Sequence, residues 1–212
     1  MEKHLYFVRH GESNSNVDGV MRGIDSILTD KGHKEAAFVA ERMTHIGVDA
    51  VIASTYPRAI QTATPIVQAL GLSLETNDLL IERRSPSAFR NKSQDAELKD
   101  EVQTFQARYC EDGYVHSDEE TLPQMRERSL AALRFLEEHP ATRICVVTHG
   151  IFLHALFCAL YEGPSYTGKD FQKTWKMATH NTGISYIRRL EEGHHWERDW
   201  HIVSWNDLAH LG

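Results

Sequence analysis

The sequence predicts an α/β fold, a three-layer α/β/α sandwich around a mainly parallel but mixed sheet. Three observations predict it. Short apolar runs of strand length alternate with segments whose apolar residues recur at helical spacing, and most of these runs end in polar residues or glycine. The length of 212 residues suits one compact domain with an insertion. We therefore expect a single domain over residues 1–212, with a cap insertion at about residues 83–120.

The first half of the chain contains two predicted strand–helix units. Their strands lie at residues 5–8 and 50–53, and a polar loop follows the first of them. Each helix that follows has an apolar stripe and recognisable ends. The residues that start and stop the two helices are Thr29 or Asp30 and Gly47, and Pro57 and Gly71.

The second half begins with an irregular stretch and then returns to regular elements. From residue 82 to about 120 apolar residues thin out and charges cluster, with one possible helix near 95–109. This stretch indicates a cap rather than part of the sheet. The later predicted elements are a helix at 121–136, a strand at 143–148, a buried helix at 151–160, and strands at 183–190 and 196–203 joined at Gly193. A closing hairpin of this kind makes the sheet mixed.

The charge balance excludes one class of partner. The chain has 23 lysines and arginines against 30 aspartates and glutamates, a net charge of −7. A nucleic-acid binder normally has a basic excess. The longest apolar stretch, at residues 151–161, contains His154 and is too short to span a membrane. We expect neither nucleic acid nor a membrane as a partner.

Cysteine usage and the N-terminal residues predict a cytoplasmic location. Cys110, Cys145 and Cys158 are odd in number, widely spaced and without a Cys-x-x-Cys pair, which indicates reduced side chains. The apolar stretch within the first ten residues is too short for a signal peptide.

Three predicted strands end in residues that suit anion chemistry. Arg9-His10 follows the first strand, residues 54–58 with Arg58 follow the second, and His149-Gly150 follows the strand at 143–148. Sites in open α/β sheets form at the carboxyl ends of the strands, so one pocket with two histidines and two arginines is expected. Guanidinium groups bind phosphate through paired hydrogen bonds. Of the 13 histidines, only His10 and His149 are expected to act there.

These segments resemble the motifs of a known family. Arg9-His10-Gly11-Glu12-Ser13, followed by Asn16, resembles the signature of the histidine phosphatase superfamily, in its phosphoglycerate mutase-like branch 1. The other similar segments are Leu28-Thr29-Asp30-Lys31-Gly32, the Ser-x-x-x-Arg-Ala-x-x-Thr-Ala run from Ser54 to Ala63, Val147-Thr148-His149-Gly150 and Asn181-Thr182-Gly183. The resemblance covers nearly the whole chain. It implies a metal-independent phosphatase that acts on small phosphomonoesters.

The resemblance also implies a role for each motif residue. His10 is the nucleophile and forms a phosphohistidine that water hydrolyses. His149 donates to the phosphoryl oxygens in the transition state, and Glu82 protonates the leaving oxygen. No metal or other cofactor is required, because the arginines and histidines supply the positive charge. The residues expected to bind the phosphoryl group or the substrate are Arg9, Arg58, Asn16 and Gly150.

The sequence departs from the family after Glu82, where it lacks the Gly-x-Trp-Glu-Gly segment of many members. Residues 83–92 contain Arg83, Arg84, Arg90 and Lys92 and no acid. Two interpretations stay open. Arg83 or Arg84 binds a second negative group of the substrate, or the segment is a solvated charge run.

Two groups near the C-terminus also have two interpretations each. His194, His195 and His201 resemble a metal cluster, but their spacing is not that of a zinc site, so a solvated hairpin is favoured. The second group either forms an exposed patch for a homodimer or packs into the core, and it consists of Trp196, Trp200 and Trp205.

Three functions fit these observations to different degrees. Hydrolysis through His10 is favoured. Phosphoryl transfer of the phosphoglycerate mutase type is disfavoured because the resemblance implies longer chains for the mutases of the family. A non-catalytic phospho-ligand binder is disfavoured because relatives of that kind lack the nucleophile or an arginine, and this chain has them all. The physiological substrate stays open at this stage.

Overall fold

The computed structural model contains one six-stranded sheet, and it describes residues 2–17, 23–90, 96–111, 113–190 and 200–212. The strands are β1 (Lys3–Arg9), β2 (Ala50–Ala53), β3 (Leu74–Thr76), β4 (Arg143–Thr148), β5 (Ile184–Arg189) and β6 (His201–Asp207). Their order in the sheet is β3-β2-β4-β1-β5-β6. The strands β1 to β4 are parallel, whereas β5 is antiparallel to both β1 and β6. The predicted mixed, mainly parallel sheet is confirmed.

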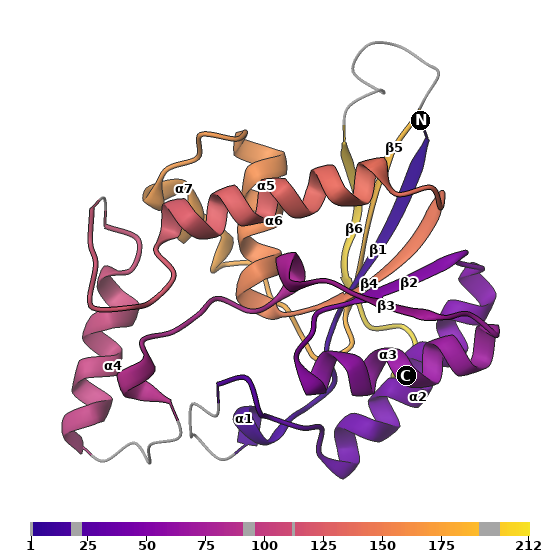
Figure 1. The fold of residues 1–212 in the computed structure, drawn as a ribbon, viewed down its shortest axis with the longest axis horizontal. Helices are drawn as coiled ribbons and strands as arrows, with labels where there is room; N and C mark the ends of the chain where they lie inside the picture. The colour runs from indigo at the N-terminus through magenta and orange to yellow at the C-terminus, as the bar shows by residue number, and fades with distance from the viewer. Residues whose placement is uncertain (1, 18–22, 91–95, 112, 191–199) are drawn as a thin grey trace.

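Helices cover both faces of the sheet (Figure 1). The α-helices are α1 (Asn14–Val17), α2 (Asp30–Ile46), α3 (Pro57–Leu70), α4 (Ala96–Arg108), α5 (Leu122–Glu138), α6 (Gly150–Glu162) and α7 (Gly168–Thr174). Two short 3-10 helices, η1 (Asp78–Leu80) and η2 (Ser87–Phe89), lie between β3 and α4. No helix in the described part of the chain is long and apolar enough to cross a membrane.

Alternation along β1 gives the sheet two buried faces. Tyr6 and Val8 pack in one cluster with apolar residues of α2 and α3. Leu5 and Phe7 point the other way and pack with apolar residues of α5 and α6. Successive side chains of a strand point to opposite faces, so a parallel sheet with apolar residues at every position must be covered on both sides. This is the predicted three-layer α/β/α arrangement.

Helix ends follow the signals in the sequence. Thr29, rather than Asp30, is the N-cap of α2, and its side chain accepts a hydrogen bond from the Gly32 N–H. Gly47 and Gly71 end α2 and α3 in the left-handed conformation, at φ 71° and φ 66°. Glycine adopts this conformation without steric cost.

The stretch after Glu82 builds a third apolar cluster beside the sandwich. Phe89 of η2 and Phe105 of α4 pack there with Met125 of α5 and Phe171 of α7. In Figure 1, α4 and η2 lie at the far end of the molecule from the sheet edge formed by β3. The residues of this cluster come from both sides of residue 120, so the segment is anchored to α5 and α7 by apolar contacts.

Some elements differ from those expected. The three-residue strand β3 was not predicted, since its residues are partly or fully exposed and show no apolar alternation. The last strand begins at His201 and runs to Asp207, later than the expected residues 196–203. Trp200 and Trp205 are partly buried against the β1–α5–α6 cluster. The expected turn at Gly193, and with it His194, His195 and Trp196, lies outside the described residues.

Candidate active site

Three strand ends meet at one cavity. In the sheet β4 lies between β2 and β1, and the three are parallel, so their carboxyl ends share one edge. The cavity there has a volume of about 300 Å³. Seven of the nine predicted site residues line it: Arg9, His10, Asn16, Arg58, Glu82, Arg83 and Arg84. The other two, His149 and Gly150, are buried next to these residues, with a distance of 5.1 Å between the ring centres of His149 and His10.

His10 is buried and held in one tautomer. Its Nδ1–H donates to the Gly11 carbonyl at 2.8 Å, because a carbonyl can only accept. The other ring nitrogen, Nε2, therefore carries a lone pair, and the Nε–H of Arg58 donates to it at 3.1 Å. The Asn181 side chain donates to the His10 carbonyl at 2.8 Å and fixes the backbone. The arrangement presents Nε2 as the nucleophilic atom.

The loop after His10 rests on α2 and α3. The Gly11 N–H donates to Thr62 Oγ1 at 3.0 Å, and the Glu12 N–H donates to Glu35 Oε2 at 2.7 Å. A Cβ added to Gly32 would lie 2.0 Å from the Glu12 carbonyl oxygen, so only glycine allows this close approach. The Glu12 side chain accepts from Lys31 Nζ at 2.8 Å, and thus braces the loop against α2.

Arg9 and Arg58 are the described cations whose charge acts on His10. Arg58 is buried, and its Nη1 donates to the Gly23 carbonyl at 3.1 Å. Arg9 donates through Nη1 to the Thr179 carbonyl, while its buried Nε has no hydrogen-bond partner. Burial lowers the pKa of both guanidinium groups, and the carboxylate of Glu82 opposes this effect. Arginine stays charged in proteins, so both groups present positive charge to the cavity.

Burial keeps both histidines neutral. It is the largest cause that holds the pKa of His10 and of His149 well below 6.5, and the Arg58 guanidinium adds to it at both residues. His149 Nε2 lies 2.8 Å from Ser54 Oγ, and its buried Nδ1 has no partner. If the Ser54 hydroxyl donates to Nε2, Nδ1 carries the proton and is a free donor.

Glu82 supplies the cap that α6 lacks. His149, the N-cap residue of α6, makes no side-chain capping bond. The Glu82 carboxylate instead accepts from the Phe152 N–H at 3.0 Å and the Ile151 N–H at 3.2 Å, and also from the Arg83 N–H at 2.9 Å. A carboxylate is favourable at a helix N-terminus, where free N–H groups and the helix dipole meet.

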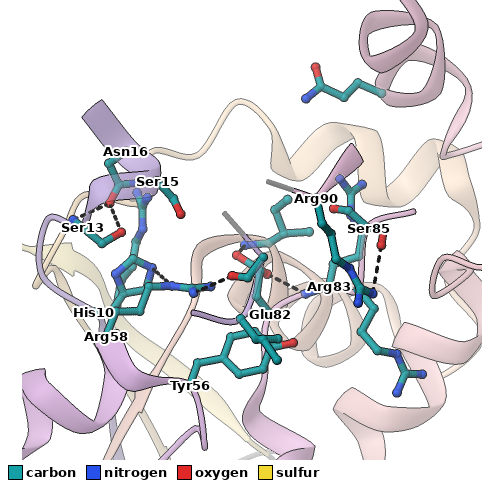
Figure 2. Close-up of a pocket in the computed structure, with 16 residues that line it drawn as sticks. His10, Ser13, Ser15, Asn16, Tyr56, Arg58, Glu82, Arg83, Ser85 and Arg90 are labelled. Carbon is teal, nitrogen blue, oxygen red and sulfur yellow. Dashed lines mark hydrogen bonds between the residues drawn. The ribbon is translucent and has the colours of Figure 1, made fainter. Parts of the chain in front are cut away.

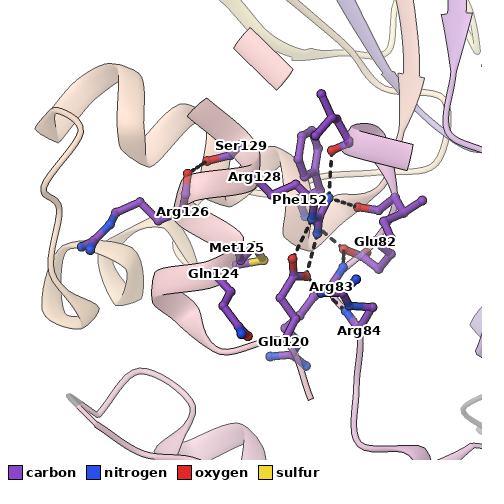
Figure 3. Close-up of polar contacts among 12 residues, drawn as sticks. Glu82, Arg83, Arg84, Glu120, Gln124, Met125, Arg126, Arg128, Ser129 and Phe152 are labelled. Carbon is purple, nitrogen blue, oxygen red and sulfur yellow. Dashed lines mark hydrogen bonds and ion pairs between the residues drawn. The ribbon is translucent and has the colours of Figure 1, made fainter. Parts of the chain in front are cut away.

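A buried ion pair fixes the segment that carries Glu82 (Figure 3). Arg128 of α5 pairs with Glu120 through two hydrogen bonds, at 2.6 and 2.7 Å. Its Nη1 also donates to the carbonyls of Leu79 and Ile81, at 2.9 and 2.7 Å. Glu120 in turn is hydrogen-bonded to the backbone of Arg84. Arg128 and Glu120 thus hold both sides of Glu82.

The remaining predicted residues have different surroundings. Asn16 Oδ1 accepts from the N–H and hydroxyl of Ser13, at 2.9 and 3.0 Å, and its Nδ2 donates to no described residue. A Cβ added to Gly150 would lie 3.2 Å from Thr179 Oγ1 and 3.4 Å from Arg9 Nε, so the backbone at Gly150 passes close to both side chains. Arg84 is exposed, whereas Arg83 is buried against the rings of Phe105 and Tyr109.

Several residues of the cavity wall were not predicted as site residues. Tyr56 and Ser15 belong to the same strand-end segments as the predicted residues, and this position in the sequence could have indicated them. Arg90 belongs to the basic run of residues 83–92, whereas nothing in the irregular stretch indicated Ser85 or Gln106. Figure 2 shows His10, Arg58, Ser13, Ser15 and Asn16 on one side of the cavity, Glu82 and Tyr56 in the middle, and Arg83, Ser85 and Arg90 on the other side.

No group of three or more His, Cys, Asp or Glu side chains among the described residues is arranged to hold a metal ion. His201 lies in the described part, at the start of β6. The two other histidines of the possible cluster, His194 and His195, lie outside the described residues.

Comparisons with known proteins agree with this geometry. The family model described as "Histidine phosphatase superfamily (branch 1)" matches residues 5–208. A protein of Enterobacter sp. (strain 638) named "Probable phosphoglycerate mutase GpmB" is 30% identical over 98% of this chain and 94% of its own. A protein of Hydrogenobacter thermophilus named "Putative phosphoserine phosphatase 2" is 28% identical over 87% of this chain and 89% of its own.

The fold is also similar to that of solved structures. The structure of Bacillus stearothermophilus YhfR aligns with a TM-score of 0.83 at 23% identity and covers 99% of this chain and 100% of that one. The fold similarity and the match of the family model over most of the chain lead to one conclusion. This chain belongs to the histidine phosphatase superfamily, branch 1.

Proposed function

We propose that the protein hydrolyses small phosphomonoesters through a phosphohistidine on His10. The observation that carries the proposal is the state of the His10 ring. Its Nδ1–H is committed to the Gly11 carbonyl, and burial keeps Nε2 unprotonated. Membership of the histidine phosphatase superfamily supports the reaction class.

The first step transfers the phosphoryl group to the enzyme. In this proposal Glu82 is protonated when the substrate is bound. The Nε2 lone pair of His10 attacks phosphorus, the bond from phosphorus to the ester oxygen breaks, and the Glu82 carboxyl group gives its proton to that oxygen and becomes a carboxylate. Arg58, 3.1 Å from Nε2, is within reach of an oxygen on a phosphorus bonded there. Arg9 Nε, Asn16 Nδ2 and His149 Nδ1 are the other donors proposed for the phosphoryl oxygens.

The second step releases phosphate. A water molecule attacks phosphorus, Glu82 takes a proton from this water, and the bond between phosphorus and Nε2 breaks. Inorganic phosphate leaves and the neutral imidazole is restored. The positive charge of Arg9 and Arg58 stabilises the developing negative charge in both steps. For this reason we propose that the reaction needs no metal ion.

Phosphoryl transfer between two positions of a substrate is the second candidate. It is favoured by the similarity to a protein named as a phosphoglycerate mutase. The two chains have nearly the same length, so chain length does not separate hydrolysis from transfer. The two reactions differ in whether water reaches the phosphohistidine.

Two assays test the proposal. With 4-nitrophenyl phosphate we expect turnover and an acid-labile phosphoenzyme, and the His10→Ala variant should lose at least about 10³-fold in kcat. Undiminished turnover in that variant contradicts the mechanism. With 3-phosphoglycerate, phosphate release indicates hydrolysis, whereas isomerisation without release indicates transfer.

We also propose a cytoplasmic location and a homodimer. The first is supported by Cys110, Cys145 and Cys158, which are all buried and unpaired. The second is supported by Ile202 and Val203, which are exposed on the edge strand β6. Cell fractionation tests the location. Light scattering tests the dimer, and a monomer mass at micromolar concentration contradicts it.

A further inference from the structure

Arg83 is a buried cation at the end of the cavity away from His10. It is 6% exposed, and its guanidinium carbon lies 4.3 Å from the centre of the Tyr109 ring and 5.0 Å from that of Phe105. Its buried Nε has no hydrogen-bond partner. No carboxylate of the described residues forms an ion pair with it. Buried charges in proteins are almost always paired, so a buried cation with no ion-pair partner among the described residues indicates a missing anion.

The stacking of Arg83 leaves its hydrogen-bonding edge available. A guanidinium that lies over aromatic rings gains attraction through its face, while its N–H groups lie in its plane. Arg83 lines the cavity, as Figure 2 shows, and therefore its free donors adjoin the space that a substrate would fill. Its two Nη nitrogens, which donate no hydrogen bond to the described residues, together match the two oxygens of a carboxylate or a phosphoryl group.

The charge of the cavity exceeds what one phosphoryl group requires. The described residues that line it include five arginines and a single carboxylate, that of Glu82, which already accepts three backbone N–H groups. Arg9 and Arg58 lie at His10, whereas Arg83 and Arg90 lie at the opposite side (Figure 2). The positive charge is thus divided between two positions on either side of Glu82.

A structural role for Arg83 alone does not account for these features. Arg108 also stacks on an aromatic ring, that of Tyr114, but it is half-exposed and pairs with Glu111 at 2.9 Å. A stacked arginine of this chain can therefore reach solvent and a counter-ion. Arg83 has little contact with solvent and no counter-ion among the described residues, although it adjoins the cavity.

We propose that Arg83 binds a second anionic group of the substrate, a carboxylate or a phosphoryl group. The substrate class is then small phosphomonoesters with a second anion on the other side of the ester oxygen. This inference rests on the proposed function, since it assumes that the other anion is the phosphoryl group at His10.

Matched pairs of probes test the inference. The first pair is phosphoglycolate and 2-hydroxyethyl phosphate, which differ in a carboxylate. The second pair is propane-1,3-diyl bisphosphate and 3-hydroxypropyl phosphate, which differ in a phosphoryl group. For each pair we measure the ratio of kcat/KM in the wild type, in Arg83→Met, and in Arg108→Met as the matched control.

We expect the wild type to prefer, in at least one pair, the member that carries a second anionic group. In Arg83→Met this ratio should fall by about 10-fold to 100-fold, which is the effect of a charge-assisted paired hydrogen bond. The pair whose ratio falls identifies the second anion. In Arg108→Met the ratios should stay unchanged, and Arg83→Lys should recover part of the preference.

Ratios that change by less than twofold in Arg83→Met overturn the inference and leave the proposed function intact. If the wild type hydrolyses neither these probes nor 4-nitrophenyl phosphate, the proposed function fails instead. Equilibrium binding of the same pairs to the same variants then decides about Arg83, and equal affinities for both members of each pair overturn the inference.

Discussion

The buried pair between Arg128 and Glu120 allows a strong prediction. The Glu120 side chain is 1% exposed and that of Arg128 is 11% exposed. In Arg128→Met the methionine fills most of the space of the arginine stem. Glu120 keeps one recorded donor, the Arg84 N–H at 3.3 Å, and the carbonyls of Leu79 and Ile81 lose theirs.

The expected cost follows from this burial. Removal of one partner of a buried ion pair lowers the free energy of unfolding by about 3–5 kcal/mol. At about 2–4 °C per kcal/mol for a chain of this length, the melting temperature should fall by about 6–20 °C. The exposed pair of Arg108 and Glu111 serves as the control, and Arg108→Met should cost less than about 1 kcal/mol.

Urea unfolding followed by circular dichroism at pH 7 measures these differences. The double variant Arg128→Met with Glu120→Gln removes the unpaired charge and should recover much of the loss. A loss below about 1 kcal/mol in Arg128→Met, or a double variant less stable than the single one, would refute the reasoning. Because the pair holds Glu82, kcat should also fall in Arg128→Met at temperatures where the variant is folded.

Three further predictions concern the site. Since the pKa of His10 and of His149 lies well below 6.5 in the folded state, the unfolded chain binds more protons below pH 6.5. The free energy of unfolding should then fall with decreasing pH, by at most about 1.4 kcal/mol per pH unit for each histidine. Urea midpoints from pH 7.5 to 5 check this, and an equal slope in His149→Asn contradicts it. Gly32→Ala should lose about 1–3 kcal/mol, because its Cβ would meet the Glu12 backbone, while exposed Lys34→Ala should melt like the wild type. Ser54→Ala leaves His149 Nε2 without its hydrogen-bond partner. It should lower kcat/KM by a factor that corresponds to about 1–3 kcal/mol of transition-state free energy, whereas Thr55→Ala should leave kcat/KM unchanged.

The sequence predicted the half of the site that lies at strand ends. Parallel strands present their carboxyl ends at one edge, so His10, Arg58 and His149 were expected together before the strand order was known. Helix starts and stops were also predictable, because a side-chain cap or a left-handed glycine is a local feature, as at Thr29 and Gly47.

The other half of the site depends on contacts between distant segments. The irregular stretch has no periodicity, so nothing in it indicated that Arg83 would stack on Phe105 and Tyr109. The same holds for Arg128, which reaches from α5 across to Glu120 and Leu79. A charge run in a sequence does not show which of its members become buried, and here Arg83 is buried while Arg84 is exposed.

The contact between Glu82 and the first turn of α6 makes the protonation of one carboxylate visible at two amide groups. The N–H groups of Ile151 and Phe152 donate to separate oxygens of Glu82. When one of these oxygens takes up a proton, the corresponding amide loses an acceptor, and its chemical shift and exchange with solvent change. The two amides are therefore natural spectroscopic probes of the proposed acid, and they report on it without an added reporter group or substrate.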